Sequence, residues 1–118
     1  ESRGFIFGSA LALKMGIGFV MARKEGKLPG KTYKVSYELE YGNATMEVPA
    51  NSFKSDDRVL LVDDLLATGG TFAALAKLVK EAGGNPVGAI TVIRLYELEG
   101  EKNAMVPCSY LLNLSDSH

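Results

Sequence analysis

Histidine, cysteine and any excess of one charge are almost missing from this sequence of 118 residues. His118 is the only histidine and also the last residue. Its position argues against a histidine-based catalytic triad and against the common zinc sites. Cys108 is the only cysteine, so no internal disulfide can form, and a reducing, cytoplasmic compartment fits. We expect Cys108 to be a buried, unreactive thiol.

Charge and hydropathy exclude two further classes of protein. The chain carries 13 Lys and Arg against 14 Asp and Glu, a formal net charge of -1. Nonspecific binding of nucleic acid requires a large basic excess, so we expect no nucleic-acid partner. No apolar run approaches the roughly 20 residues of a membrane-spanning helix, so we expect no membrane association. A content of 47% hydrophobic and 23% charged residues suits the packed core of one domain.

The first third of the chain mixes one helical pattern with short breaker-rich segments. Ile6–Met15 is rich in alanine and leucine and is followed by Gly16, which predicts a short helix with a glycine stop. The apolar run Gly18–Ala22 predicts a short buried strand. The basic segment Arg23–Gly30, which contains a proline and two glycines, predicts an exposed loop.

Two alternating segments then predict a β-hairpin. Tyr33–Tyr41 alternates strictly between larger apolar and polar residues, and Thr45–Val48 alternates again. Gly42–Asn43 lies between them and predicts the turn.

The remainder of the chain predicts a parallel α/β sheet. Arg58–Asp64 has a continuous apolar run, as expected of a strand covered on both faces. Thr71–Ala82 has apolar residues at the spacing of one helical face and ends at two glycines. Val87–Ile93 and Val106–Leu114 predict further strands. Strand, helix and strand in this order give a right-handed βαβ unit.

The segment Val59–Thr71 carries the chemistry of this sequence. A buried strand ends in Asp63 and Asp64, and a short loop then enters a helix through Thr68-Gly69-Gly70-Thr71. The amides of the loop and the positive end of the helix suit a phosphate, which glycines allow to approach closely. The alternative is a ligand-free acidic turn before a glycine-rich helix start. The whole thirteen-residue arrangement favours a ligand site.

Two carboxylates beside a phosphate would repel it unless the ligand also presents hydroxyl groups. A ribose 5-phosphate meets both demands, because its hydroxyls donate to Asp63 and Asp64 while its phosphate lies in the loop. No lysine follows the glycines, so the pattern is not an NTPase P-loop. Gly16-Ile17-Gly18 lacks the third glycine of a dinucleotide fingerprint.

Val59–Thr71 resembles the phosphoribosyl pyrophosphate signature of the type I phosphoribosyltransferases. Glu1–Gly8, Arg23–Gly30 and Leu39–Gly42 resemble, in the same order, segments of the adenine phosphoribosyltransferases. The resemblance runs from Glu1 to about Leu98. It implies one α/β domain over residues 1–118, with a parallel sheet, flanking helices and a β-hairpin flap. It also implies that the N-terminal part of the family's domain, including the hood over the base, is absent from this sequence.

The resemblance further implies a reaction in which a purine nitrogen displaces pyrophosphate from ribose C1, giving AMP. Phosphoribosyl pyrophosphate and adenine would be the substrates, AMP and pyrophosphate the products. Mg²⁺ would arrive with the pyrophosphate rather than occupy a protein cage. A homodimer and a flap that excludes water are implied as well. The alternatives are transfer to another base and a noncatalytic regulator that senses the donor; a phosphoribosyl pyrophosphate synthetase would need an ATP site that is not evident.

The roles implied for individual residues follow from the matched motifs. Glu40 would be the catalytic acid or base. The substrate-binding residues would be Ala67, Thr68, Gly69, Gly70 and Thr71 for the 5′-phosphate, Asp63 and Asp64 for the ribose hydroxyls, Ser2, Arg3, Arg23, Lys24 and Lys27 for pyrophosphate, Tyr41 beside Glu40, and Leu95 for the base.

Simpler interpretations remain open for several of these residues. Arg23, Lys24 and Lys27 also suit a solvated loop, and Glu40 lies on the polar face of its hairpin, where an exposed carboxylate is ordinary. Tyr41 falls on the apolar face and is partly structural on that basis. Arg94 precedes Leu95 where the family's pattern has an acidic or small residue, so it either alters the base contacts or points to solvent.

Overall fold

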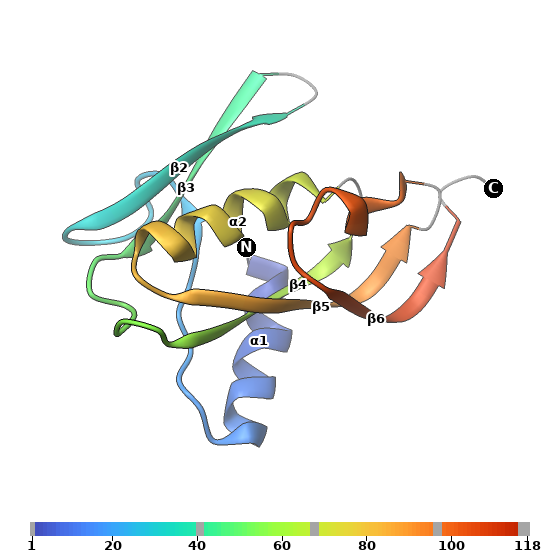
Figure 1. The fold of residues 1–118 in the computed structure, drawn as a ribbon, viewed down its shortest axis with the longest axis horizontal. Helices are drawn as coiled ribbons and strands as arrows, with labels where there is room; N and C mark the ends of the chain where they lie inside the picture. Colours follow the sequence, from blue (N-terminus) through green and yellow to red (C-terminus); the bar gives the residue numbers. More distant parts are fainter. Residues whose placement is uncertain (1, 40–41, 67–68, 96–97, 116–118) are drawn as a thin grey trace.

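The fold comprises a parallel sheet, an antiparallel hairpin sheet and two main helices in the part of the chain that the structure describes (Figure 1). The structure is a computed structural model and describes residues 2–39, 42–66, 69–95 and 98–115. The elements are α1 (Ser2–Met15), β1 (Arg23–Lys24), β2 (Thr32–Leu39), β3 (Gly42–Pro49), β4 (Arg58–Leu66), α2 (Gly70–Glu81), β5 (Asn85–Leu95), the short 3-10 helix η2 (Gly100–Lys102) and β6 (Cys108–Leu114).

The main sheet has the order β4-β5-β6, and both pairs of strands are parallel. The helix α2 connects β4 to β5, as the sequence predicts for a βαβ unit. Leu61 of β4 packs with α2, whereas the neighbouring Val62 faces α1. Because successive strand residues point to opposite faces, the two helices cover opposite faces of β4 (Figure 1).

Two glycines one helical turn apart allow α1 to approach β4 closely. A Cβ atom at Gly4 would lie 2.9 Å from Oδ1 of Asp63, and one at Gly8 would lie 2.9 Å from Cε1 of Phe19. Residues spaced by four lie on one face of a helix, so both glycines face Val62 of β4. This contact brings the N-terminal end of α1 to the carboxyl half of β4.

The hairpin prediction is confirmed, and its position is set by α2. Antiparallel pairs such as Val35 with Met46 join β2 to β3, and the short strand β1 pairs with the other edge of β3. Val35, Met46 and Val48 form a buried cluster with Ala74, Leu78 and Ala82 of α2. The sequence predicts Gly42 and Asn43 as the turn, but both already belong to β3, where they pair with Leu39 and Glu38.

The strand predicted at Gly18–Ala22 is wrong, because this segment has no regular secondary structure. Phe19 and Val20 remain exposed. The ring of Phe19 packs edge-on against Phe5 of α1, with 6.2 Å between the ring centroids. The apolar run therefore contacts a helix instead of joining a sheet.

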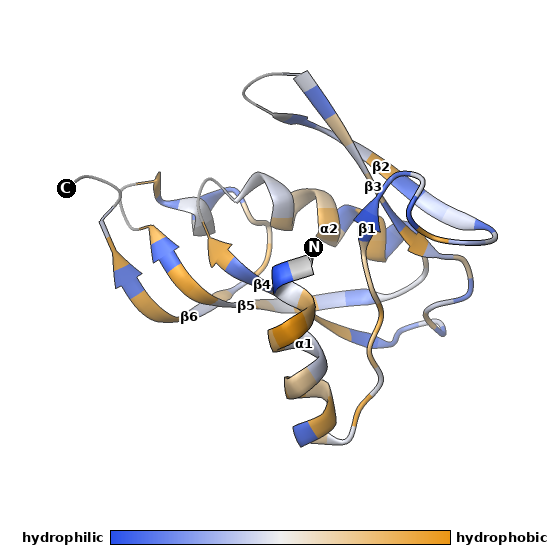
Figure 2. Ribbon diagram, turned by 180° about the vertical axis from the view of Figure 1, so that it is seen from behind, coloured by the Kyte–Doolittle hydropathy of each residue, from blue (hydrophilic) through white to orange (hydrophobic). Residues whose placement is uncertain are grey.

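Other element boundaries differ from the predicted ones by a few residues. α1 begins at Ser2 rather than Ile6, and β4 continues through Leu65 and Leu66 instead of ending at Asp64. Arg23 and Lys24 form β1 rather than the start of a loop (Figure 2). Cys108 is half-buried at the start of β6 rather than fully buried. Within the described residues, no helix has the length and apolarity that crossing a bilayer requires.

Candidate functional site

The candidate site begins where β4 ends and α2 starts. Asp63 and Asp64 lie in the carboxyl half of β4, and α2 begins at Gly70. The first hydrogen bond of α2 runs from the amide of Ala73 to the carbonyl oxygen of Gly69, at 3.0 Å. Amides that precede this bond point out of the helix end, beside the carboxyl edge of the parallel sheet. The strand and the helix that the sequence predicts on either side of the loop are therefore present.

Gly69 is required by its backbone conformation and by its surroundings. Its φ is 87°, in the left-handed region, and it is buried at the N-cap of α2. A Cβ atom would lie 2.0 Å from the carbonyl oxygen of Gly100 and 3.1 Å from the amide nitrogen of Ala104. The sequence suggests a glycine here for the approach of a phosphate. The structure shows a second reason, which is the close approach of the chain around η2.

Asp63 is a half-buried carboxyl whose pKa lies above its ordinary value. Burial is the main cause, because it disfavours the charged form. The amide of Asp64 donates to Oδ1 of Asp63 at 2.8 Å and acts in the opposite direction, whereas the neighbouring Asp64 carboxylate raises the pKa further. Asp63 is thus an acceptor that the fold holds at some cost in free energy.

Asp64 is paired with a residue that the resemblance assigns to pyrophosphate. Nε of Arg3 lies 3.0 Å from Oδ2 of Asp64, with side chains that are 79% and 20% exposed, respectively. The pair forms because α1 carries Arg3 to the carboxyl half of β4. The structure therefore brings together Arg3, which is predicted to bind pyrophosphate, and Asp63 and Asp64, which are predicted to bind the ribose.

The basic segment beside β3 contributes unequally to this region. Arg23 is half-buried, and its Cζ lies 5.7 Å from the ring centroid of Phe5. Lys24 and Lys27 are exposed. Of these three residues, Lys24 borders the cavity described next, together with Arg3 and Asp64.

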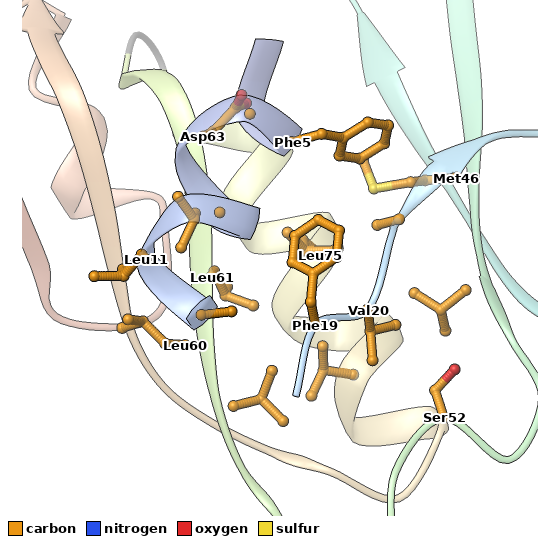
Figure 3. Close-up of a pocket in the computed structure, with 18 of the residues that line it drawn as sticks. Phe5, Leu11, Phe19, Val20, Met46, Ser52, Leu60, Leu61, Asp63 and Leu75 are labelled. Carbon is orange, nitrogen blue, oxygen red and sulfur yellow. The ribbon is translucent and has the colours of Figure 1, made fainter. Parts of the chain in front are cut away.

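A cavity of about 750 Å³ lies between α1, β4, α2 and the hairpin (Figure 3). Its charged and polar lining includes Arg3, Lys24, Asp63, Asp64 and Thr71. Figure 3 shows Asp63 near Phe5 at one end, whereas Leu60 and Leu11 line the opposite end. A volume of this size lies within the usual range for small-molecule sites, roughly 300–1,000 Å³.

Leu95 lies at the carboxyl end of β5, next to the end of β4, and is half-buried. Arg94 is turned toward β6. Its Nη1 donates to Oδ1 of Asn113 at 3.0 Å, and its Cζ lies 5.3 Å from the ring centroid of Tyr110. Arg94 therefore packs on side chains of the neighbouring strand, which neither sequence-based alternative described.

Four predicted site residues, Glu40, Tyr41, Ala67 and Thr68, lie outside the described residues, and so does the side chain of Ser2. Their proposed roles remain predictions. Among the residues that are described, no three His, Cys, Asp or Glu side chains gather as metal ligands. Asp63 and Asp64 supply hard oxygen donors of the kind that Mg²⁺ combines with substrate phosphates.

Sequence reasoning missed Glu47, a carboxylate that is only 4% exposed. Hydrogen bonds from the hydroxyl of Thr32 and the amide of Gly26 hold its pKa below the ordinary value, with a further contribution from the charge of Lys34. The alternation of β3 places Glu47 on a polar face, which gives no sign of burial. Only the folded chain shows that the segment after β1 covers it.

Comparisons of the sequence with a family model and with curated proteins agree on one family. Residues 1–110 match the family described as phosphoribosyl transferase domain. The adenine phosphoribosyltransferase of Shewanella amazonensis is 55% identical over 102 residues, which are 86% of this chain and 56% of that protein. The chain thus spans just over half the length of such curated relatives.

Solved structures agree with the fold. The adenine phosphoribosyltransferase of Thermoanaerobacter pseudethanolicus superposes with a TM-score of 0.92 at 44% identity, covering 97% of this chain and 67% of that one. The Saccharomyces cerevisiae enzyme, solved with an imino-altritol bisphosphate and adenine, gives 0.91 at 44% identity, covering 95% and 64%.

Proposed function

Because the chain belongs to the phosphoribosyltransferase family, we propose that the protein transfers the phosphoribosyl group of phosphoribosyl pyrophosphate to adenine, forming AMP and pyrophosphate in purine salvage. One observation carries the proposal: Asp63 and Asp64 lie in the carboxyl half of β4, shortly before the N-terminus of α2, with Arg3 beside them. The choice of adenine rests on the relatives named above. We further propose that residues 1–118 form a single phosphoribosyltransferase domain.

The donor's ribose 5-phosphate would lie across the end of β4 and the start of α2. The 5′-phosphate would be held by residues 67–71, where helix amides and hydroxyls offer donors to an anion. The ribose hydroxyls would donate to Asp63 and Asp64. This arrangement supports the proposal because it places acceptors beside a site for an anion, as a phosphorylated sugar demands.

The pyrophosphate would be bound by basic side chains on both sides of the ribose site. The position of Arg3 supports this role, because its Nε lies 3.0 Å from Oδ2 of Asp64 and Lys24 borders the same cavity. Ser2, Arg23 and Lys27 complete the proposed set. When the donor binds, the Arg3 side chain would leave Asp64 and bind the pyrophosphate, while a ribose hydroxyl donates a hydrogen bond to the Asp64 carboxylate. Arg3 and Asp64 would thereby each gain a partner from the substrate.

Mg²⁺ fits the residues present, because two carboxylates are what this ion uses beside phosphate oxygens and water. It would bind mainly to the pyrophosphate, near Asp63 and Asp64, and would offset charge on the leaving group. The protein's own cations act in the same sense, since developing negative charge on pyrophosphate is stabilised by fixed positive groups.

The chemistry at ribose C1 would pass through a state resembling an oxocarbenium ion, as in glycoside hydrolysis. We propose that Glu40 exchanges a proton with the purine, with Tyr41 beside it, and that Leu95 packs on the base. The hairpin would act as the flap that excludes water from the oxocarbenium-like ribosyl group. We also propose a homodimer that completes the pyrophosphate site, and a cytoplasmic location, which suits a chain with one cysteine.

The decisive experiment incubates the full-length protein with phosphoribosyl pyrophosphate, Mg²⁺ and each common base in turn, and identifies the nucleotide by mass spectrometry. AMP from adenine alone is the expected result. A different nucleotide would assign another base to the site. Tight binding of the donor without formation of any nucleotide product would overturn the proposed enzymatic activity and favour a noncatalytic sensor.

A further inference from the structure

Glu47 is a buried carboxylate that the proposed chemistry does not use. It lies in β3 between Met46 and Val48 and is 4% exposed. Charged side chains are rarely buried to this extent unless their oxygens are hydrogen-bonded. The partners of Glu47 therefore indicate what its burial achieves.

One oxygen of Glu47 binds the turn that carries the basic residues, and the other binds the start of β2. Oε1 accepts the amide of Gly26 at 2.7 Å, and Oε2 accepts the hydroxyl of Thr32. Gly26 has a φ of 86° and lies in the turn after β1. The carboxylate thus joins the turn after β1 to the first residue of β2.

Backbone contacts fix the start of the same segment. Arg23 and Lys24 pair with Glu47 and Met46, and the amide of Glu25 donates to the carbonyl oxygen of Thr45 at 2.9 Å. Beyond Glu25 the segment turns away from β3, and the amide of Lys27 bonds back to the carbonyl oxygen of Lys24 at 3.2 Å. The hydrogen bond from Gly26 to Glu47 lies inside that turn, between the two lysines.

We propose that Glu47 is a positioning residue that fixes the turn at Gly26 and thereby places Lys24 and Lys27 for the pyrophosphate of the donor. The inference rests on the proposed function for its ligand, but not for its geometry. A charge-assisted hydrogen bond is about twice as strong as a neutral one, and here it restrains a lysine-bearing turn that would otherwise sample other conformations. A negative residue thereby organises a site for an anion without contacting it.

The test is a double-mutant cycle in the full-length protein. Glu47→Ala should raise the KM for phosphoribosyl pyrophosphate and the Kd for pyrophosphate by roughly 10-fold, the usual effect of losing a hydrogen bond to a charged group. kcat should change less than KM. In a Lys24→Ala and Lys27→Ala background, adding Glu47→Ala should change either constant by less than about 2-fold, because the positioned groups are already gone.

Two conservative variants separate positioning from general stability. Glu47→Gln keeps an oxygen for the amide of Gly26 and should recover most of the pyrophosphate affinity. Glu25→Gln removes the exposed ion pair of Glu25 with Lys34, whose Nζ–Oε2 distance is 2.9 Å, and should leave both constants near wild type. Equal losses in Glu25→Gln and Glu47→Ala, or additive effects of Glu47→Ala and the lysine changes, would overturn the inference.

Hydrogen exchange provides a readout that needs no catalysis. The amide of Gly26 should exchange at least about 10-fold faster in Glu47→Ala than in wild type, and at a near-normal rate in Glu47→Gln. Unchanged exchange in Glu47→Ala would show that the turn is held by other contacts and would overturn the inference. If wild type makes no nucleotide but binds pyrophosphate with this pattern, the proposed function fails and the positioning role of Glu47 stands.

Discussion

Replacing Gly69 by alanine should destabilise the fold more than the same change at a glycine with an equally unusual backbone. At Gly69 two costs add. A left-handed conformation costs a residue with a Cβ about 1–2 kcal/mol, and the new atom would lie 2.0 Å from the carbonyl oxygen of Gly100. Moving the chain near η2 to relieve such overpacking costs about 1–3 kcal/mol. We therefore expect Gly69→Ala to lose about 2–5 kcal/mol of unfolding free energy.

Gly83 provides the matched control. Its φ is 97°, against 87° for Gly69, but a Cβ atom at Gly83 would have no neighbour within 4 Å. Gly83→Ala should therefore lose only the conformational cost, about 1–2 kcal/mol. Urea unfolding of both variants without ligand, monitored by circular dichroism, measures the difference between their unfolding free energies. Equal losses in the two variants would refute the contact with Gly100 as a reason for the glycine, and no loss in either would refute both costs.

Three further predictions concern the charged residues of the site. Asp63→Asn should raise the unfolding free energy at pH 7 by up to about 1 kcal/mol, a small gain because solvent screens a half-buried group. The gain should vanish below about pH 4, because a raised pKa in the folded protein is a cost only while the carboxyl is ionised. A gain in stability that persists at low pH would contradict this cause. Arg3→Ala should change stability by less than about 1 kcal/mol, because Arg3 is 79% exposed and solvent screens its charge, yet weaken donor binding in a calorimetric titration. Normal donor affinity would remove Arg3 from the pyrophosphate site. Glu40→Gln should lower kcat by roughly 10²–10⁴ with donor affinity retained, and steady-state kinetics showing wild-type turnover would return Glu40 to the role of an exposed carboxylate.

Patterns that repeat along one element are predictable from the sequence. The alternation from Tyr33 onward predicts the hairpin, and the apolar face of residues 71–82 predicts α2 against the sheet. The order of strand and helix around Asp63 and Asp64 predicts that both carboxylates lie in the carboxyl half of a parallel strand. Each of these features depends on local spacing, which a sequence displays directly.

Features that depend on two distant segments are not predictable in this way. The Arg3–Asp64 pair exists because Gly4 and Gly8 let α1 lie against β4. The burial of Glu47 depends on how the segment after β1 folds back over β3. The apolar run Gly18–Ala22 has the composition of a strand, yet its partner is a helix. In each case the tertiary contact overrides, or adds to, what the local pattern indicates.

Within the described residues, one half of the hairpin packs on α2 and the other half is exposed. Val35, Met46 and Val48 pack against α2, whereas Glu38, Gly42 and Asn43, farther along the ribbon, are exposed (Figure 1). A hollow of about 320 Å³ lies beneath its middle, lined by Ser36 and Tyr37 of β2 and by Gly70 and Ala73 of α2. Tyr37 also packs against this cluster, so the packed part of the hairpin extends two residues beyond Val35. The hollow leaves room for the ribbon beyond Tyr37 to bend toward the start of α2 without disturbing the buried cluster. The stiffness of the last few residue pairs would then set how readily the proposed flap closes.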